Sequence, residues 1–229
     1  MARVGPAPLG AWRCAMGWSE VAARHHARRL EREGWLERYS MTRGDGSLFV
    51  ATRAGVAMVG IAVRAAGPPA PTWWAHLCGC AWTAAWLTAR GRELQGCREV
   101  LVDPVWAGTV RWHDHKGAHR AGHRPDLAWV PDGGRVAIEV ELAQKSTERL
   151  RAILGLHARW RASGTSSGVL YVCGDPDGCD RITTIAEAVG LLSAKGGGLR
   201  VELLEAMRAQ ALVACEANRM DRVAGVSGG

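Results

Sequence analysis

The sequence predicts an α/β protein built from two domains, and three observations lead to this fold class. Helix-forming and strand-forming segments alternate over the second two-thirds of the chain, which is the order of an α/β fold. The first sixty residues contain a helix followed by two short strands. Between these regions, residues 65–71 (AAGPPAP) are too rich in proline and small residues to continue a helix or a central strand. We therefore expect domains at residues 1–66 and 72–220.

Composition and length exclude several classes of protein. The chain has 229 residues, 48% hydrophobic and 22% charged, which is ordinary globular usage. Its seven scattered cysteines, without a secretory signal, indicate reduced thiols. No apolar run approaches the roughly 20 residues of a membrane span. We expect a cytoplasmic protein with no membrane partner.

Positive charge is concentrated at the front of the chain. The formal net charge is +7, and residues 1–64 hold ten arginines against five acidic residues. Arginine suits forked contacts to phosphates and guanine edges, so nucleic acid is an expected partner. A GC-rich genome would also favour arginine in the composition, but it would not explain this clustering.

The first region has the order of a winged helix. Residues 19–33 predict a helix that ends at Gly34, and residues 36–42 and 47–51 predict a hairpin joined by RGDG at 43–46. A basic helix can enter the major groove of double-stranded DNA while the hairpin tip reaches a flanking phosphate. The alternative is a solvated helix with internal salt bridges. The expected DNA-binding residues are Arg24, His25, Arg28, Arg29, Arg32 and, at the hairpin tip, Arg43.

The second region alternates helices and strands. Residues 125–130 and 135–142 predict a hairpin around the turn at 131–134, and residues 113–124 predict a loop rich in histidine. The other expected elements are a buried helix at 73–90, strands at 99–103 and 109–112, a helix at 147–162, a strand at 168–173, a helix at 182–195, a strand at 199–203 and a helix to about 218.

Carboxylates gather on the predicted hairpin. Glu139 and Glu141 leave the same face of one strand, while apolar residues occupy the other face, and Asp126 begins the partner strand. Three convergent carboxylates repel one another unless a cation joins them, so we expect them to hold Mg²⁺ or Mn²⁺. Such a site could activate water against a phosphodiester. The alternative is a solvated acidic face without a metal.

The pattern Pro125-Asp126, twelve residues, then Glu139-Val140-Glu141 resembles the PD-(D/E)xK nuclease superfamily. That resemblance implies a restriction-endonuclease-like mixed-sheet α/β domain in which Asp126 and Glu139 bind metal. The family usually has lysine where this chain has Glu141, and Lys145 could supply the missing charge. The implied catalytic residues are Asp126, Glu139, Glu141 and Lys145.

The whole arrangement is most similar to the replication-relaxation family of actinobacterial plasmids and integrative elements. The segments that carry the resemblance are residues 27–38 (ARRLEREGWLER), the hairpin through Thr52-Arg-Ala-Gly55, the helix near His76 and residues 125–154. It implies a role in replication, transfer or regulation of mobile-element DNA, with replication or transfer proteins as partners. A homodimer would bind palindromic DNA. The alternative is a non-catalytic accessory factor whose nuclease-like fold has decayed.

Two further clusters offer weaker metal-binding patterns. His113, His115, His119 and His123 could bind a transition metal, although histidine-rich loops also occur without one. Cys78-Gly-Cys80 lacks the second ligand pair that a structural zinc site needs.

Overall fold

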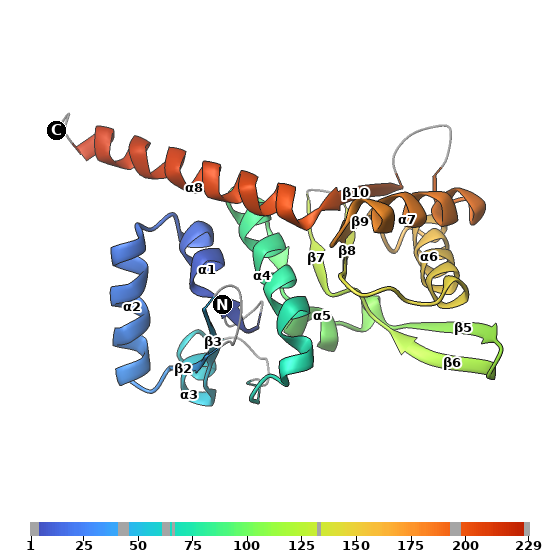
Figure 1. Ribbon diagram of the computed structural model, residues 1–229, viewed down its shortest axis with the longest axis horizontal. Coiled ribbons are helices and arrows are strands. Elements are labelled where there is room, and N and C mark those ends of the chain that lie inside the picture. The colour runs from blue at the N-terminus through green and yellow to red at the C-terminus, as the bar shows by residue number, and fades with distance from the viewer. Residues whose placement is uncertain are drawn as a thin grey trace.

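The N-terminal region of the computed structural model forms a small sheet packed with helices (Figure 1). The structure describes residues 5–40, 46–60, 65, 67–131, 134–192 and 198–226. The sheet has the order β1-β3-β2, and both pairs are antiparallel. The elements are β1 (Ala7–Pro8), α1 (Leu9–Met16), α2 (Glu20–Arg32), β2 (Leu36–Ser40), β3 (Ser47–Ala51) and α3 (Arg53–Met58).

Helix α2 and the hairpin after it confirm the sequence prediction. The Ser19 hydroxyl caps α2 by accepting the Ala22 N–H at 3.1 Å, and Gly34 adopts the positive φ of 71° that ends the helical segment. The hairpin pairs β2 with β3 from Leu36↔Ala51 to Ser40↔Ser47. Its tip, including Arg43, lies outside the described residues.

Helix α1 joins the N-terminal region to the rest of the chain. Ala11 and Cys14 of α1 are buried in the same apolar cluster as residues of α4 (Trp74–Thr88) and α8 (Leu204–Val226). In Figure 1, α8 extends from the larger sheet across the top of α4 and α1. The short N-terminal segment thus rests on two helices from elsewhere in the chain.

The second region contains a five-stranded mixed sheet of order β10-β9-β8-β7-β4. Strands β8, β9 and β10 are parallel, whereas β7 is antiparallel to both of its neighbours. The remaining elements are η1 (Pro71–Trp73), β4 (Leu94–Gln95), α5 (Cys97–Val102), η2 (Pro104–Trp106), β5 (Gly108–Asp114), β6 (Gly117–His123), β7 (Leu127–Trp129), β8 (Val136–Glu141), α6 (Thr147–Ala162), β9 (Gly168–Cys173), α7 (Pro176–Ala188) and β10 (Leu199–Leu203).

Both faces of this sheet are covered. Ile138 and Val140 of β8 pack with α4 and α8, whereas Ala137 packs with α6 and α7 on the opposite face. The alternative of a solvated acidic face is therefore wrong for Glu139, which is only 5% exposed. Helix α4 approaches β8 closely at Gly79, where a Cβ would lie 2.8 Å from Val140 Cγ1.

Other strand and loop predictions also need correction. Residues predicted as a strand at 99–103 lie mostly in helix α5, because the Glu99 carboxylate accepts the Gly96 N–H at 2.9 Å and stabilises the helix start. The predicted loop at 113–124 is largely the hairpin β5–β6, whose backbone ladder needs no apolar periodicity. Helix α7 begins at Pro176, well before residue 182, because Asp175 caps it and proline suits the first helical position.

Candidate active site

All four residues predicted for catalysis line one pocket. Asp126, Glu139, Glu141 and Lys145 border an open cavity of about 800 Å³. Asp126 directly precedes β7, both glutamates belong to β8, and Lys145 stands in the loop that leads into α6. The start of α4 and the strands β5 and β6 complete the wall. The four side chains therefore share one pocket, although among the described residues no group of donor atoms within 4.8 Å joins all three carboxylates.

Asp126 is held on both sides of its carboxylate. Its Oδ2 atom accepts the Val140 N–H at 2.8 Å, which attaches the side chain to β8. Its Oδ1 atom lies 3.1 Å from His76 Nε2 in the first turn of α4. The hydrogen bond to Asp126 raises the pKa of His76. Cys80, one turn further along α4, places Sγ 3.6 Å from the same imidazole nitrogen.

Glu139 shares one oxygen with two histidines. Its Oε1 atom lies 2.8 Å from Nε2 of His123 at the end of β6 and 2.9 Å from Nε2 of His157 in α6. Burial opposes ionisation of Glu139, but the charges and hydrogen bonds of both histidines outweigh it and hold its pKa well below the ordinary value. The glutamate is thus a carboxylate throughout the physiological pH range.

Glu141 contacts Lys145, the residue expected from the sequence to supply the charge that the nuclease pattern lacks. The Lys145 ammonium donates to Glu141 Oε2. Burial raises the pKa of Glu141, and Lys145 partly opposes that rise. The backbone at Lys145 is held in place by two contacts. Arg181 donates to the Lys145 carbonyl at 2.7 Å, and the next residue, Ser146, caps α6.

The three histidines at these carboxylates were not among the predicted site residues. In the sequence, His76 marks only a helix that carries the family resemblance, and His123 is only a member of the histidine-rich segment. His157 carried a signal that sequence reasoning missed: it lies on the apolar face of the predicted helix at 147–162, three residues after Leu154 and seven after Leu150. An imidazole on a buried face needs a polar partner, and here the partner is Glu139.

Two groups in the described part of the chain have donors suited to a cation. They are His76, Cys80 and Asp126, and His123, Glu139 and His157; within each group the donor atoms lie within 4.8 Å of one another. Carboxylates suit Mg²⁺ and Mn²⁺, and imidazole adds affinity for transition metals. Each carboxylate already contacts a basic side chain, so an arriving cation would have to replace part of those contacts.

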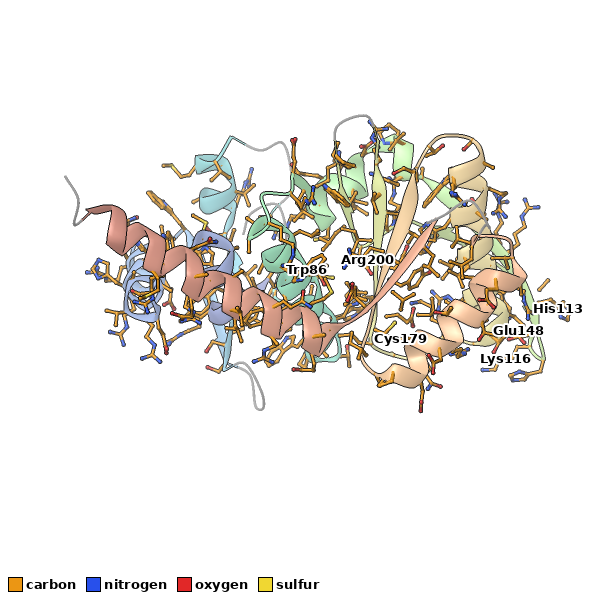
Figure 2. The ribbon with its side chains drawn as sticks, turned by 90° about the horizontal axis from the view of Figure 1, so that it is seen from above. Trp86, His113, Lys116, Glu148, Cys179 and Arg200 are labelled. Carbon is orange, nitrogen blue, oxygen red and sulfur yellow. The ribbon has the colours of Figure 1, made fainter. Side chains whose placement is uncertain are left out.

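The four histidines of the histidine-rich segment do not form one group of metal donors in the described structure. Of its four histidines, only His123 reaches a donor group among the described residues. His119 instead lies 2.9 Å from Asp114 and stacks on Trp112 with ring centroids 5.0 Å apart. Figure 2 shows His113 near the far end of the β5–β6 hairpin.

The described candidate DNA-binding side chains lie on the surface of α2, at one edge of the molecule (Figure 1). The exposed members are Arg24, His25, Arg28, Arg29 and Arg32. Arg24 lies 2.5 Å from Glu20, and Arg29 lies 4.0 Å from Glu33, so acidic neighbours contact two of them. Such exposed ion pairs contribute at most about 1 kcal/mol to stability, so the arginines can leave them to contact a phosphate.

Comparison with known proteins does not place this chain in a protein family. No protein-family model, no curated protein and no solved structure matches this chain. Within the described residues, no helix is both long and apolar enough to cross a membrane. The function therefore has to be argued from the geometry of the pocket and the charge of α2.

Proposed function

We propose that this chain is a DNA-binding protein of a plasmid or integrative element, akin to the replication-relaxation family, with a metal-dependent phosphodiester-cleaving site. The observation that carries the proposal is the meeting of Asp126, Glu139, Glu141 and Lys145 at one open pocket. Three carboxylates beside an ammonium group match what hydrolysis of a phosphodiester requires: a cation site and a positive donor for the phosphate.

In this proposal, Asp126, Glu139 and Glu141 hold Mg²⁺ or Mn²⁺. When bound, the cation supplies Lewis acidity at the phosphate and lowers the pKa of a water. His123 and His157 keep Glu139 ionised before the cation arrives. Lys145 orients the attacking water or the scissile phosphate. At the mouth of the pocket, Trp73 is 60% exposed and offers a ring on which a base can stack.

The N-terminal region would bind the duplex as a winged helix. The order β1, α1, α2, β2 and β3 supports this reading, with α2 as the helix that enters the major groove. The normal winged helix has one more supporting helix before this order, and the packing of α1 against α4 and α8 offers a substitute for it. Proteins of replication or transfer are the proposed partners, and a homodimer would select palindromic sites.

A plasmid assay tests the catalytic proposal. Supercoiled plasmid is incubated with the purified protein and Mg²⁺ or Mn²⁺, and nicked and linear products are measured. We expect the parent to cleave, Asp126→Asn and Glu139→Gln to lose cleavage, and Glu187→Gln, which alters an exposed glutamate on α7, to retain it. Equal behaviour of the parent and both site variants, each shown to be folded, would reject a nuclease.

A second candidate is a non-catalytic DNA-binding accessory factor. The observation that favours it is that every carboxylate of the pocket already has a basic partner, which balances its charge without a metal. This candidate predicts salt-dependent DNA binding by the parent and the absence of cleavage with either cation in the plasmid assay.

A further inference from the structure

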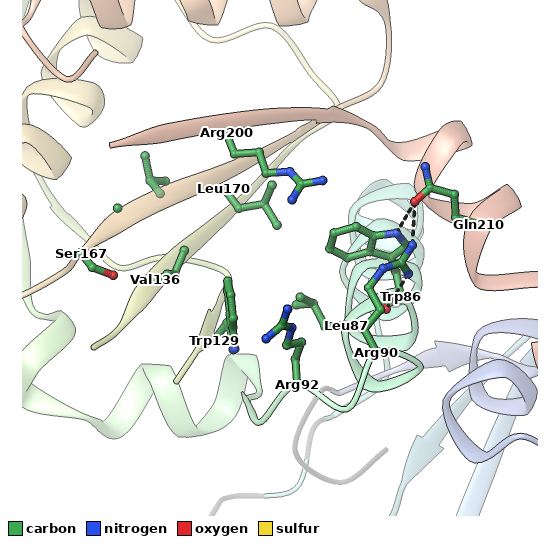
Figure 3. A pocket seen from close by; sticks show the side chains of 12 residues that line it. Trp86, Leu87, Arg90, Arg92, Trp129, Val136, Ser167, Leu170, Arg200 and Gln210 are labelled. Carbon is green, nitrogen blue, oxygen red and sulfur yellow. Dashed lines mark hydrogen bonds between the residues drawn. The ribbon is translucent and has the colours of Figure 1, made fainter. Parts of the chain in front are cut away.

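A second pocket lies at the opposite ends of the same structural elements. It has a volume of about 490 Å³ and shares no lining residue with the carboxylate pocket. Helix α4 contributes His76 to the carboxylate pocket and Trp86 to the second pocket. Strand β8 contributes Glu139 to the carboxylate pocket and Val136 to the second pocket, which is shown in Figure 3. We propose that this second pocket binds a nucleoside di- or triphosphate.

Three arginines make the pocket positive. Arg90 and Arg92 belong to the segment between α4 and β4, and Arg200 belongs to β10. Arg200 Nε lies 2.7 Å from Glu202 Oε1. Among the described residues, no carboxylate forms a direct ion pair with Arg90 or Arg92, although the Glu202 charge also acts on Arg90. Arg90 donates only to neutral oxygens there, those of Trp86 and Gln210. An anion with more than one negative charge would balance these guanidinium groups.

Two indoles line the pocket: Trp86 is only 5% exposed and is contacted by two arginines, whereas Trp129 is partly exposed. The Arg90 guanidinium carbon lies 4.2 Å from the centroid of the Trp86 ring, and that of Arg200 lies 5.5 Å from it. The Trp86 Nε1–H donates to Gln210 at 2.8 Å, which fixes the orientation of the ring (Figure 3). On the other side, Arg92 lies 4.7 Å from the centroid of the Trp129 ring. Figure 2 shows Trp86 and Arg200 near each other, between α4 and β10.

The combination of these groups selects the class of ligand. Guanidinium groups recognise phosphate oxygens, and both indole and guanidinium planes stack on nucleobases. Leu87, Val136 and Leu170 provide an apolar surface on which a base can rest. The volume lies in the range of small-molecule sites, roughly 300–1,000 Å³. The shared chemistry, a base with phosphates, also occurs at the end of a nucleic-acid strand, and we assign the free nucleotide.

Isothermal titration calorimetry in the presence of EDTA tests this inference. The proposed cleavage at the carboxylate pocket needs a divalent cation, so EDTA keeps that activity out of the measurement. The ligands are ATP, GTP, adenosine, inorganic triphosphate and a short single-stranded oligonucleotide. We expect at least one of the nucleoside triphosphates to bind at least about tenfold more tightly than adenosine, inorganic triphosphate or the oligonucleotide. The matched variants remove exposed charge: Arg92→Ala/Arg200→Ala in the pocket, and Arg53→Ala/Arg219→Ala elsewhere. The pocket variant should weaken binding at least about tenfold, and the control should leave it unchanged.

Several results would overturn the assignment. One is that neither ATP nor GTP binds at about 1 mM. Another is that the two double variants bind the nucleotide with equal affinity. A third is that inorganic triphosphate or the oligonucleotide binds as tightly as the nucleotide, or more tightly. A further variant, Trp129→Leu, keeps an apolar side chain but removes the ring, and unchanged nucleotide affinity in this variant would exclude stacking at Trp129. Loss of plasmid cleavage has no bearing on these outcomes, so the two proposals fail separately.

Discussion

His157 Nε2 lies 2.9 Å from Glu139 Oε1, and the two residues are only 2% and 5% exposed. The other ring nitrogen of His157, Nδ1, is buried without a hydrogen-bond partner in the described structure. A proton on Nδ1 would be unsatisfied, whereas a proton on Nε2 is donated to Glu139, so we assign Nε2–H as the donor of this contact. With His123 on the same oxygen, this contact links α6, β6 and β8 beneath the pocket.

Truncating Glu139 should destabilise the metal-free protein. Glu139→Ala leaves the buried His157 and the partly buried His123 without their acceptor, and breaking a buried pair of this kind costs about 3–5 kcal/mol. Urea unfolding in EDTA measures the free energy of unfolding. The control Glu187→Ala changes an exposed glutamate and should remain within about 0.5 kcal/mol of the parent. A stabilised Glu139→Ala protein would mean that repulsion among the carboxylates outweighs the histidine contacts.

Stability of the metal-free protein should depend on the protonation of His123. Burial opposes its charge, but the charge and hydrogen bond of Glu139 raise the pKa of His123 above the ordinary value of about 6.5. A raised pKa stabilises the folded state fully below the unfolded value, and this contribution is lost as pH rises through the folded value. The difference in unfolding free energy between the parent and His123→Asn should therefore be largest at about pH 6 and shrink towards about pH 9.

Urea unfolding of both proteins in EDTA across that range measures this difference. Because His76 also has a raised pKa and is present in both proteins, its contribution cancels in the comparison. A difference that grows with pH would contradict the assigned contact between His123 and Glu139.

Removal of Lys145 should reduce cleavage more than folding. Lys145→Ala deletes the ammonium group that contacts Glu141, and the loss of one positioned donor typically lowers kcat by about 10²–10³-fold. It also removes an influence that lowers the pKa of Glu141, so that pKa should rise further. Plasmid cleavage with Mg²⁺ measures the first effect, and thermal unfolding verifies that the protein folds. Lys116→Ala, at an exposed residue of the β5–β6 turn, is the matched control. Full activity of folded Lys145→Ala would assign the lysine a purely structural contact.

The salt dependence of DNA affinity should report on α2. If Arg24, Arg28 and Arg32 each neutralise a phosphate, each alanine substitution should reduce the slope of log K against log salt by about 0.9. Fluorescence anisotropy with a labelled duplex over a range of salt concentrations measures the slope. Arg219→Ala, on α8, provides a control in which the slope should not change. Affinity that does not depend on salt would reject electrostatic binding by α2.

Local sequence signals predicted much of the secondary structure. Ser19 and Gly34 mark the limits of the segment containing α2, and the predicted helix at 147–162 and strands at 168–173 and 199–203 have the bounds that the structure shows. The apolar run at 99–103 predicts a strand, but most of it lies in α5, which the Glu99 contact to the Gly96 N–H stabilises at its start. Only part of the run is buried: Val100 is 0% exposed, whereas Leu101 is 65% exposed.

The sequence by itself determined that Asp126, Glu139 and Glu141 could meet, because a hairpin and the two-residue period of a strand bring them to one edge. Only the tertiary structure decided what surrounds them. His76, His123 and His157 come from α4, β6 and α6, and their contacts depend on how those elements pack against the sheet. The spacing of residues along the chain specifies neighbours within one element, whereas partners from separate elements are set by burial of the apolar faces that bring those elements together.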